Sequence, residues 1–156
     1  MGRAAWCERL DAPASAVWNL VRWDNEAALI ESGAFARVEY EERRPLPGAT
    51  RWLHPHEGPP IRELLETIDG AEMRYSYRLL DPGPMPLRQY VGEVAIDSED
   101  QSHCRLSVAC TFETLGISEA QWIEAYEAMQ KRLFEFLREA VTKKGVRHLS
   151  SGRKGA

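Results

Sequence analysis

The sequence predicts a single α+β domain, in which an antiparallel sheet of about seven strands packs against one long C-terminal helix. The middle of the chain is a series of short segments of alternating polarity separated by turn signals, a pattern typical of consecutive hairpins. The end of the chain carries apolar residues at i, i+3, i+4 and i+7 over about 24 residues, the spacing of one helix face. The length of 156 residues suits one domain.

The N-terminal part is expected to hold one strand followed by two short helices. Residues 4–10 predict the strand. An acid and a proline, Asp11 and Pro13, then come before an apolar segment, and both are favoured in the first turn of a helix. Residues 25–31 predict the second helix, which a Ser-Gly pair ends.

Six further strands are expected, at residues 35–43, 50–54, 61–68, 73–80, 87–97 and 104–113. The dipeptide Asp69-Gly70 is a strong hairpin signal between two of them. Successive side chains point to opposite faces of a sheet, so the more apolar parity of each strand is expected to face the helix. This inward set is predicted to include Tyr75, Tyr77, Tyr90, Val108 and Phe112.

The parity of the strand at 61–68 depends on the turn that follows it. A two-residue turn would put Leu64 beside Tyr75 and leave Glu63 on the outer face. A three-residue turn with a bulge would put Glu63 opposite Tyr77, facing the helix. The residues alone leave both registers open.

The long helix is expected to begin after Ser118, because Gln121 three residues later completes a capping box. It is expected to end near Lys143, where lysines and a glycine follow each other. Its apolar face carries, among others, Trp122, Tyr126 and Met129.

Charge divides the chain into two parts. The last 14 residues hold five basic side chains and no acid, whereas the other 142 hold 15 basic and 24 acidic side chains. We therefore expect a domain over residues 1–142 and a basic, flexible tail over residues 143–156. An acidic domain repels phosphate backbones, so nucleic acid is not expected as a partner. No apolar run approaches the roughly 18 residues of a membrane span, so no membrane partner is expected either.

The cysteines and histidines give no sign of a disulfide or a metal site. Three cysteines cannot all pair within one chain, and they lack the C-x-x-C spacing of redox and zinc sites. With no secretory signal in the first residues, this predicts reduced thiols and a cytoplasmic protein. His54, His56 and Glu57 stand alone in a proline-rich loop, so no metal or other cofactor is expected. The chain is expected to be a monomer or a homodimer.

Several segments carry a family resemblance through their order. They are Leu10-Asp11-Ala-Pro-Ala-Ser-Ala-Val-Trp18, the acidic strand 63–69 followed by Tyr75-Ser-Tyr77, the strands 90–96 and 105–112, and the helix 122–141. Together they resemble the START/Bet v 1-like (SRPBCC) superfamily, and within it the polyketide cyclase/dehydrase-like group. The resemblance implies the helix-grip fold, in which a curved sheet wraps around the long helix and leaves a hydrophobic cavity. It also implies a partner that is a hydrophobic or aromatic small molecule, which such proteins bind, carry or cyclise.

The candidate site follows from this resemblance. In related proteins an acid before this hairpin lines the ligand pocket, which favours the inward register of Glu63; an apolar cavity would raise the pKa of its carboxyl group. If the protein is an enzyme, Glu63 or His54 would move a proton in a metal-free cyclisation, dehydration or lyase reaction. Tyr77 would polarise a ligand oxygen. The ligand contacts are expected from Trp52, Tyr75, Tyr90, Val108, Phe112, Trp122, Tyr126 and Met129.

Two other functions stay open. One is a non-catalytic carrier with the same cavity, and the other is a protein-interaction module of the same superfamily. The candidate residues also have plain structural interpretations: a surface glutamate, a loop histidine, and aromatic side chains that only fill the core.

Overall fold

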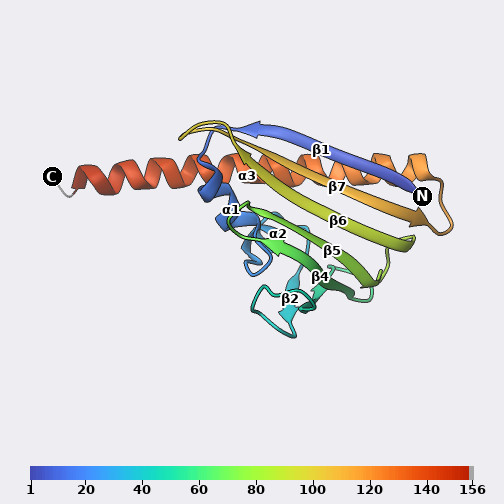
Figure 1. The fold of residues 1–156 in the computed structure, drawn as a ribbon. Helices are drawn as coiled ribbons and strands as arrows, with labels where there is room; N and C mark the ends of the chain where they lie inside the picture. Colours follow the sequence, from blue (N-terminus) through green and yellow to red (C-terminus); the bar gives the residue numbers. More distant parts are fainter. Residues whose placement is uncertain (155–156) are drawn as a thin grey trace.

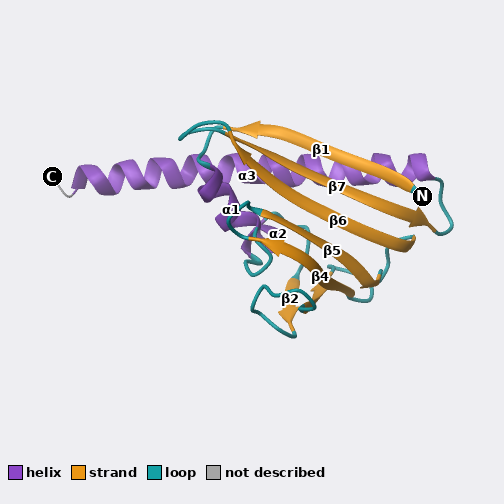
Figure 2. Cartoon of the chain, in the orientation of Figure 1, coloured by secondary structure: helices purple, strands orange, loops and turns teal. Residues whose placement is uncertain are grey.

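The computed structural model describes the backbone of residues 1–154 and the side chains of residues 1–142. The elements in chain order are β1 (Gly2–Leu10), α1 (Ala14–Val21), α2 (Ala27–Glu31), β2 (Arg37–Tyr40), β3 (Thr50–His54), β4 (Ile61–Asp69), β5 (Arg74–Asp81), β6 (Leu87–Ser98), β7 (Cys104–Thr114) and α3 (Glu119–Lys154). The seven strands form one antiparallel sheet in the order β1-β7-β6-β5-β4-β3-β2. Helix α3 runs along one face of the curved sheet, and α1 and α2 lie at one end of that face (Figures 1 and 2). The predicted fold class is confirmed.

Two predicted boundaries differ from the structure by more than two residues. The strand expected at residues 35–43 is confined to β2. Helix α3 continues to Lys154 instead of ending near Lys143. A single glycine inside a helix costs only about 1 kcal/mol, and no proline follows Gly145 to stop the helix. The prediction of a flexible tail concerns residues 143–156, whose side chains lie outside the described part of the chain.

Alternation in the central strands agrees with the predicted inward faces. In β6 and β7 the buried positions include Tyr90, Val94, Val108 and Phe112, while their sequence neighbours on the other face are more exposed, except for Ala109. Strand β5 turns Tyr75 and its alternate neighbours the same way. Because the inward faces of these strands meet α3, the hydrophobic core lies between the sheet and the helix.

Strand β4 turns Glu63 inward, but through neither of the two predicted turns. The loop between β4 and β5 has four residues, 70–73, and the bulge lies within β4 at Glu66. Because of this extra residue, the inward-facing positions of β4 before the bulge and those after it have opposite parity. Glu63 is therefore buried and pairs with Leu79 in the register, rather than with Tyr77 as predicted.

The capping box at the start of α3 is confirmed. The backbone N–H of Ser118 donates to the side-chain oxygen of Gln121 at 2.9 Å, and the N–H of Gln121 donates to Ser118 Oγ at 3.1 Å. This reciprocal pair satisfies donors that the first helical turn leaves free. It fixes the point at which the chain enters α3, and with it the position of Trp122 one residue later.

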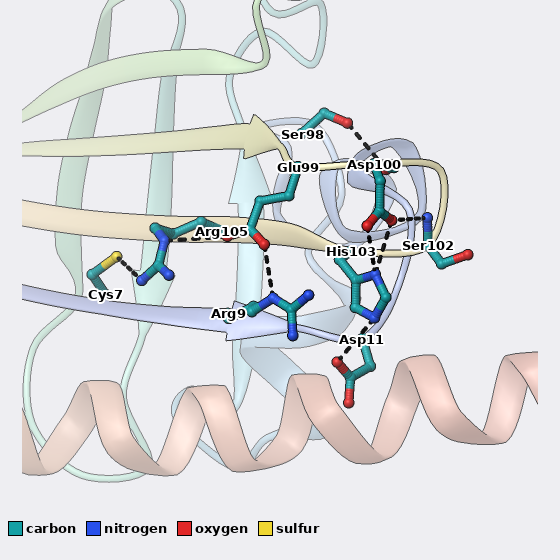
Figure 3. Close-up of polar contacts among 9 residues, drawn as sticks. All are labelled: Cys7, Arg9, Asp11, Ser98, Glu99, Asp100, Ser102, His103 and Arg105. Atoms are coloured by element: carbon teal, nitrogen blue, oxygen red, sulfur yellow. Dashed lines mark hydrogen bonds and ion pairs between the residues drawn. The ribbon is translucent and has the colours of Figure 1, made fainter.

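Polar side chains join the end of β1 to the hairpin between β6 and β7 (Figure 3). Arg9 Nε donates to Glu99 at 2.7 Å, and His103 lies 2.8 Å from Asp100 and 3.6 Å from Asp11. These groups are partly exposed, so each pair contributes little to stability by itself. Their place at the edge of the sheet helps to hold the register of β1. None of them lines the cavity described below.

Two further expectations concern cysteines and membranes. All three cysteines are free, with Cys104 and Cys110 buried and Cys7 exposed. Within the part of the chain that the structure describes, no helix is both long and apolar enough to cross a membrane.

Candidate functional site

A cavity of about 180 Å³ lies between the inner face of the sheet, α3 and the segment around α1 and α2. Its wall is mostly aliphatic and aromatic, with a few polar groups among them. An apolar cavity of about 150 Å³ is known to hold benzene. The space therefore suits a ligand with one or two rings.

Most of the predicted site residues meet at this cavity. Those that line it are Glu63, Tyr75, Tyr77, Tyr90, Val108, Trp122, Tyr126 and Met129. They come from β4, β5, β6, β7 and α3, so only the folded sheet brings them together. Met129 is 38% exposed although it lines the cavity, and Ala34 after α2 is exposed as well. We infer that the cavity opens to solvent between α3 and the loop that follows α2.

His54 and Trp52 do not reach the cavity. In β3 the inward parity belongs to Arg51 and Leu53, so the residues between and after them point outward. His54 Nε2 lies 2.8 Å from a carboxylate oxygen of Glu39. The ring of Trp52 lies under the guanidinium of Arg62 on the outer face, 5.5 Å from it. Among the described residues, no group of three or more His, Cys, Asp or Glu side chains is placed to hold a metal ion.

Phe112 faces inward but does not line the cavity; it packs behind the residues that do. Its side chain is fully buried, and its ring centroid lies 6.2 Å from that of Trp122. The ring lies so close to Gly2 of β1 that a Cβ there would stand 2.5 Å from it. Phe112 therefore packs between β1 and α3 and is not part of the wall.

A buried ion pair forms the polar part of the wall. Arg51 Nε donates to Glu63 Oε1 at 2.9 Å, and Arg51 Nη2 lies 2.8 Å from the same oxygen. Arg51 Nη1 donates to the carbonyl oxygen of Trp23 at 2.8 Å, and the guanidinium lies 3.9 Å over the Trp23 ring. Arg51 and Glu63 are 4% and 5% exposed. Arg51 was missing from the predicted site, because the sequence of β3 has an apolar residue on each parity, Trp52 on one and Leu53 on the other.

The two oxygens of the Glu63 carboxylate differ. Oε1 takes the contacts from Arg51, whereas Oε2 forms no hydrogen bond with any residue that the structure describes. Burial raises the pKa of Glu63 above the ordinary value of a carboxyl group, and the nearby Arg51 charge opposes this rise without cancelling it. Glu63 is thus a stronger base than an exposed carboxylate, with one oxygen free.

Three tyrosines stand beside this ion pair. The Tyr75 hydroxyl donates to the carbonyl oxygen of Val21 at 2.9 Å, and the hydroxyls of Tyr77 and Tyr90 lie 3.4 Å apart. Burial raises the pKa of Tyr75 to about 12 and that of Tyr77 and Tyr90 well above the usual value. All three hydroxyls therefore stay protonated at neutral pH and remain hydrogen-bond donors.

The position of Tyr77 depends on a glycine in the next strand. Tyr77 and Gly92 are paired in the register of β5 and β6. A Cβ at Gly92 would stand 2.3 Å from the Tyr77 ring, so the ring lies directly over the backbone of β6. The missing side chain lets the Tyr77 hydroxyl reach across β6 to Tyr90.

We expect Gly92→Ala to displace the Tyr77 ring and to lower the free energy of unfolding by about 1–3 kcal/mol, the usual cost of an overpacked core. Urea unfolding at neutral pH measures this loss. Gly70→Ala is the matched control, because a Cβ at Gly70 meets no atom within 4 Å. Equal stability of the Gly92→Ala variant and the wild type would mean that the ring moves aside freely.

Comparison with known sequences points to one family. The sequence model of the family described as "Polyketide cyclase / dehydrase and lipid transport" matches residues 8–147. No curated protein is similar enough in sequence to count as a match.

Solved structures share the fold at low sequence identity. The protein XoxI from Bacillus cereus has a TM-score of 0.78 at 17% identity, over 91% of this chain and 96% of that one. A protein from Thermobifida fusca has a TM-score of 0.74 at 22% identity, over 92% and 95%. Norcoclaurine synthase from Thalictrum flavum, in complex with dopamine and hydroxybenzaldehyde, has a TM-score of 0.66 at 13% identity, over 91% and 87%. At these identities the likeness concerns the fold alone.

Proposed function

Because the chain belongs to the polyketide cyclase/dehydrase and lipid transport family, we propose that it binds a small aromatic molecule in its cavity and moves a proton on that molecule with Glu63. The reaction would be a cyclisation, a dehydration or a lyase-type elimination. The observation that carries the proposal is the free oxygen of the Glu63 carboxylate, held in a mostly apolar wall.

The size and composition of the cavity support an aromatic ligand. Four aromatic residues of the wall follow one another toward α3, with centroids 6.0 to 6.2 Å apart: Tyr75, Tyr77, Tyr90 and Trp122. Such rings favour edge and tilted contacts with a further ring. Norcoclaurine synthase, which shares the fold, holds dopamine and hydroxybenzaldehyde, two compounds with one ring each. The volume of about 180 Å³ suits compounds of this kind better than a large polycyclic polyketide.

The chemistry rests on an acid–base group beside neutral donors. A carboxylate with a raised pKa is a better base at neutral pH, and it takes up a proton more readily than an exposed glutamate. Once it holds that proton, it can return it to another atom of the ligand. The hydroxyls of Tyr77 and Tyr90 would donate to a ligand oxygen on which negative charge develops. These steps use only side chains of the chain itself.

A carrier function is the second candidate. Arg51 already holds one oxygen of Glu63, and a buried ion pair of this kind is found in proteins that perform no chemistry. A carrier would bind the same ligands without turnover. An assay of proton transfer from a neutral two-ring substrate separates the two functions, because a carrier would not accelerate it.

Naphthalene tests the binding proposal, since it is apolar and has two rings. Calorimetric titration should give a dissociation constant on the order of 10–100 µM, as expected for a small apolar ligand. Val108→Phe should weaken binding at least about tenfold, because the larger side chain fills the cavity from β7. Thr111→Phe, on the outer face of the same strand, is the matched control. Binding that Val108→Phe leaves unchanged would place the ligand elsewhere.

A further inference from the structure

We propose that the ligand of this cavity is an uncharged aromatic alcohol or phenol, whose hydroxyl donates to the free oxygen of Glu63, and that anionic and cationic analogues are rejected. This inference rests on the proposed function and names the class of molecule that the same cavity takes. It follows from what the arginines of the wall and the buried Glu63 already bind; the other acid of the wall, Glu93, is exposed.

The basic groups of the wall are engaged by the protein. All three nitrogens of Arg51 have partners: two contact Glu63 Oε1 and the third donates to the Trp23 carbonyl oxygen. One face of the guanidinium is covered by the Trp23 ring. The other arginine in the wall, Arg22, pairs with Asp24 at 2.6 Å. A carboxylate ligand would find no cation without a partner here, and it would meet the negative charge of Glu63.

The Glu63 carboxylate offers an acceptor and needs a donor. Its Oε2 has no hydrogen-bond partner among the described residues, although the side chain is only 7% exposed. An acceptor that faces a mostly apolar cavity without a donor is costly, and a charged acceptor more so. The tyrosines of the wall do not supply one: the Tyr75 hydroxyl donates to the Val21 carbonyl oxygen, and the Tyr77 hydroxyl lies beside that of Tyr90. The donor that completes this group must come from the ligand, or from water before the ligand binds.

Charge balance selects a neutral donor over an ammonium group. The carboxylate of Glu63 and the guanidinium of Arg51 together carry no net charge. An ammonium ligand would leave a net positive charge in a cavity walled mainly by apolar side chains, and such a charge is costly to bury. A hydroxyl group satisfies the same oxygen without adding a charge. The aromatic part of the ligand then lies against Tyr77 and Tyr90, which also line the cavity.

Calorimetry at pH 7 with four two-ring compounds tests the inference: naphthalene, 2-naphthol, 2-naphthoate and 2-naphthylmethylammonium. We expect 2-naphthol to bind at least about tenfold more tightly than naphthalene, as for a hydrogen bond to a charged acceptor. The carboxylate and the ammonium compounds should each bind at least about tenfold more weakly than naphthalene, because of the charge that they bury.

Variants test whether the preference for 2-naphthol over naphthalene depends on Glu63. In Glu63→Gln the ratio of the affinities for 2-naphthol and naphthalene should fall to about twofold or less, whereas Glu66→Gln, on the outer face of the same strand, should keep the wild-type ratio. The double variant Arg51→Met/Glu63→Leu removes the whole ion pair, leaves no charge unpaired, and should abolish the ratio in the same way.

Each outcome decides the matter. If naphthalene binds but 2-naphthol binds no more tightly, or if either charged compound binds as well as 2-naphthol, the inference is wrong and the proposed binding function stands. If none of the four compounds binds, the proposed function fails and the inference fails with it. A preference for 2-naphthol that survives in both Glu63 variants also overturns the inference.

Discussion

Replacing Arg51 by leucine should lower the free energy of unfolding by about 3–5 kcal/mol, which is the usual cost of removing one partner of a buried ion pair. The variant leaves Glu63, only 5% exposed, without the charge that it faces. It also loses the donor to the Trp23 carbonyl oxygen and the contact with the Trp23 ring. Urea unfolding at pH 7, followed by circular dichroism, measures the loss.

The loss should depend on pH, and its sign follows from Glu63. The folded protein holds the pKa of this carboxyl above its unfolded value of about 4.5, chiefly because of burial. Removing the Arg51 charge takes away the interaction that opposes this rise, so the folded pKa rises further. Below about pH 4.5 the group is protonated in both states, and its contribution to stability is complete.

As pH rises through the pKa of Glu63 in the folded protein, the contribution of this group to stability is lost. The deficit of Arg51→Leu against the wild type should therefore grow from pH 4.5 toward neutrality, by at most about 1.4 kcal/mol per pH unit. Unfolding curves at several pH values between 4.5 and 8 measure this change. A deficit of equal size over the whole range would assign the effect to lost packing rather than to the unpaired carboxylate.

The double variant Arg51→Met/Glu63→Leu provides the control. Replacing both partners of a buried pair by apolar side chains of similar volume is often neutral or stabilising. Most of the stability that the single variant loses should therefore return. If the double variant is as unstable as Arg51→Leu, the contact of Arg51 with Trp23, and not the charge of Glu63, is what stabilises this part of the core.

The parts of the fold that local signals specify were predictable. Alternation in β6 and β7 gave the inward faces with Tyr90 and Val108, and the capping residue Ser118 gave the start of α3. These features depend on neighbours within a few residues, so the sequence carries them directly. The order of such segments then limited the architecture to a sheet covered by one helix.

The site was less predictable where it depends on contacts between distant segments. The bulge at Glu66 sets the parity of β4, yet no residue type at this position indicates a bulge. A register with Glu63 inward and one with Glu63 outward both satisfy the local pattern. Arg51 shows a different difficulty. A charged residue in a strand is most often solvated, and it becomes a plausible core residue only once Glu63, 12 positions away, is known to face it.

His54 shows a third difficulty. Its chemistry made it a candidate base, but alternation within β3 turns it outward, toward Glu39. Alternation removes His54 from the cavity and adds Arg51 only once Leu53, and not Trp52, is known to face inward, and a strand of five residues does not settle that choice. Residue type suggests chemistry, whereas parity decides whether that residue reaches the cavity.

Glu63→Gln should slow proton transfer in the cavity by about 100-fold, while the Michaelis constant changes little. A suitable substrate is 5-nitrobenzisoxazole, a neutral two-ring compound that needs no cofactor. A carboxylate oxygen takes the proton from the ring carbon next to nitrogen, the electron pair of that C–H bond completes a nitrile, and the N–O bond breaks. The product, 2-cyano-4-nitrophenolate, absorbs visible light, so its formation can be followed directly.

The expected effect follows from the environment of Glu63. An apolar wall strips water from its carboxylate and raises its pKa, and both changes make it a stronger base toward carbon. Glutamine keeps the shape and can still accept from Arg51, but it has no basic oxygen. Because the proton moves only in the transition state, kcat should fall with little change in the Michaelis constant. In the wild type, kcat should rise with pH as Glu63 loses its proton, with a midpoint above the ordinary carboxyl value.

Glu66→Gln is the matched control, since Glu66 lies at the bulge of the same strand and pairs with Arg78 outside the cavity. It should keep the wild-type rate. Free acetate at equal concentration gives the rate of an exposed carboxylate, and the protein should exceed it in proportion to the desolvation of Glu63. If Glu63→Gln reacts as fast as the wild type although naphthalene binds both, Glu63 moves no proton, and the carrier function becomes the better account of the cavity.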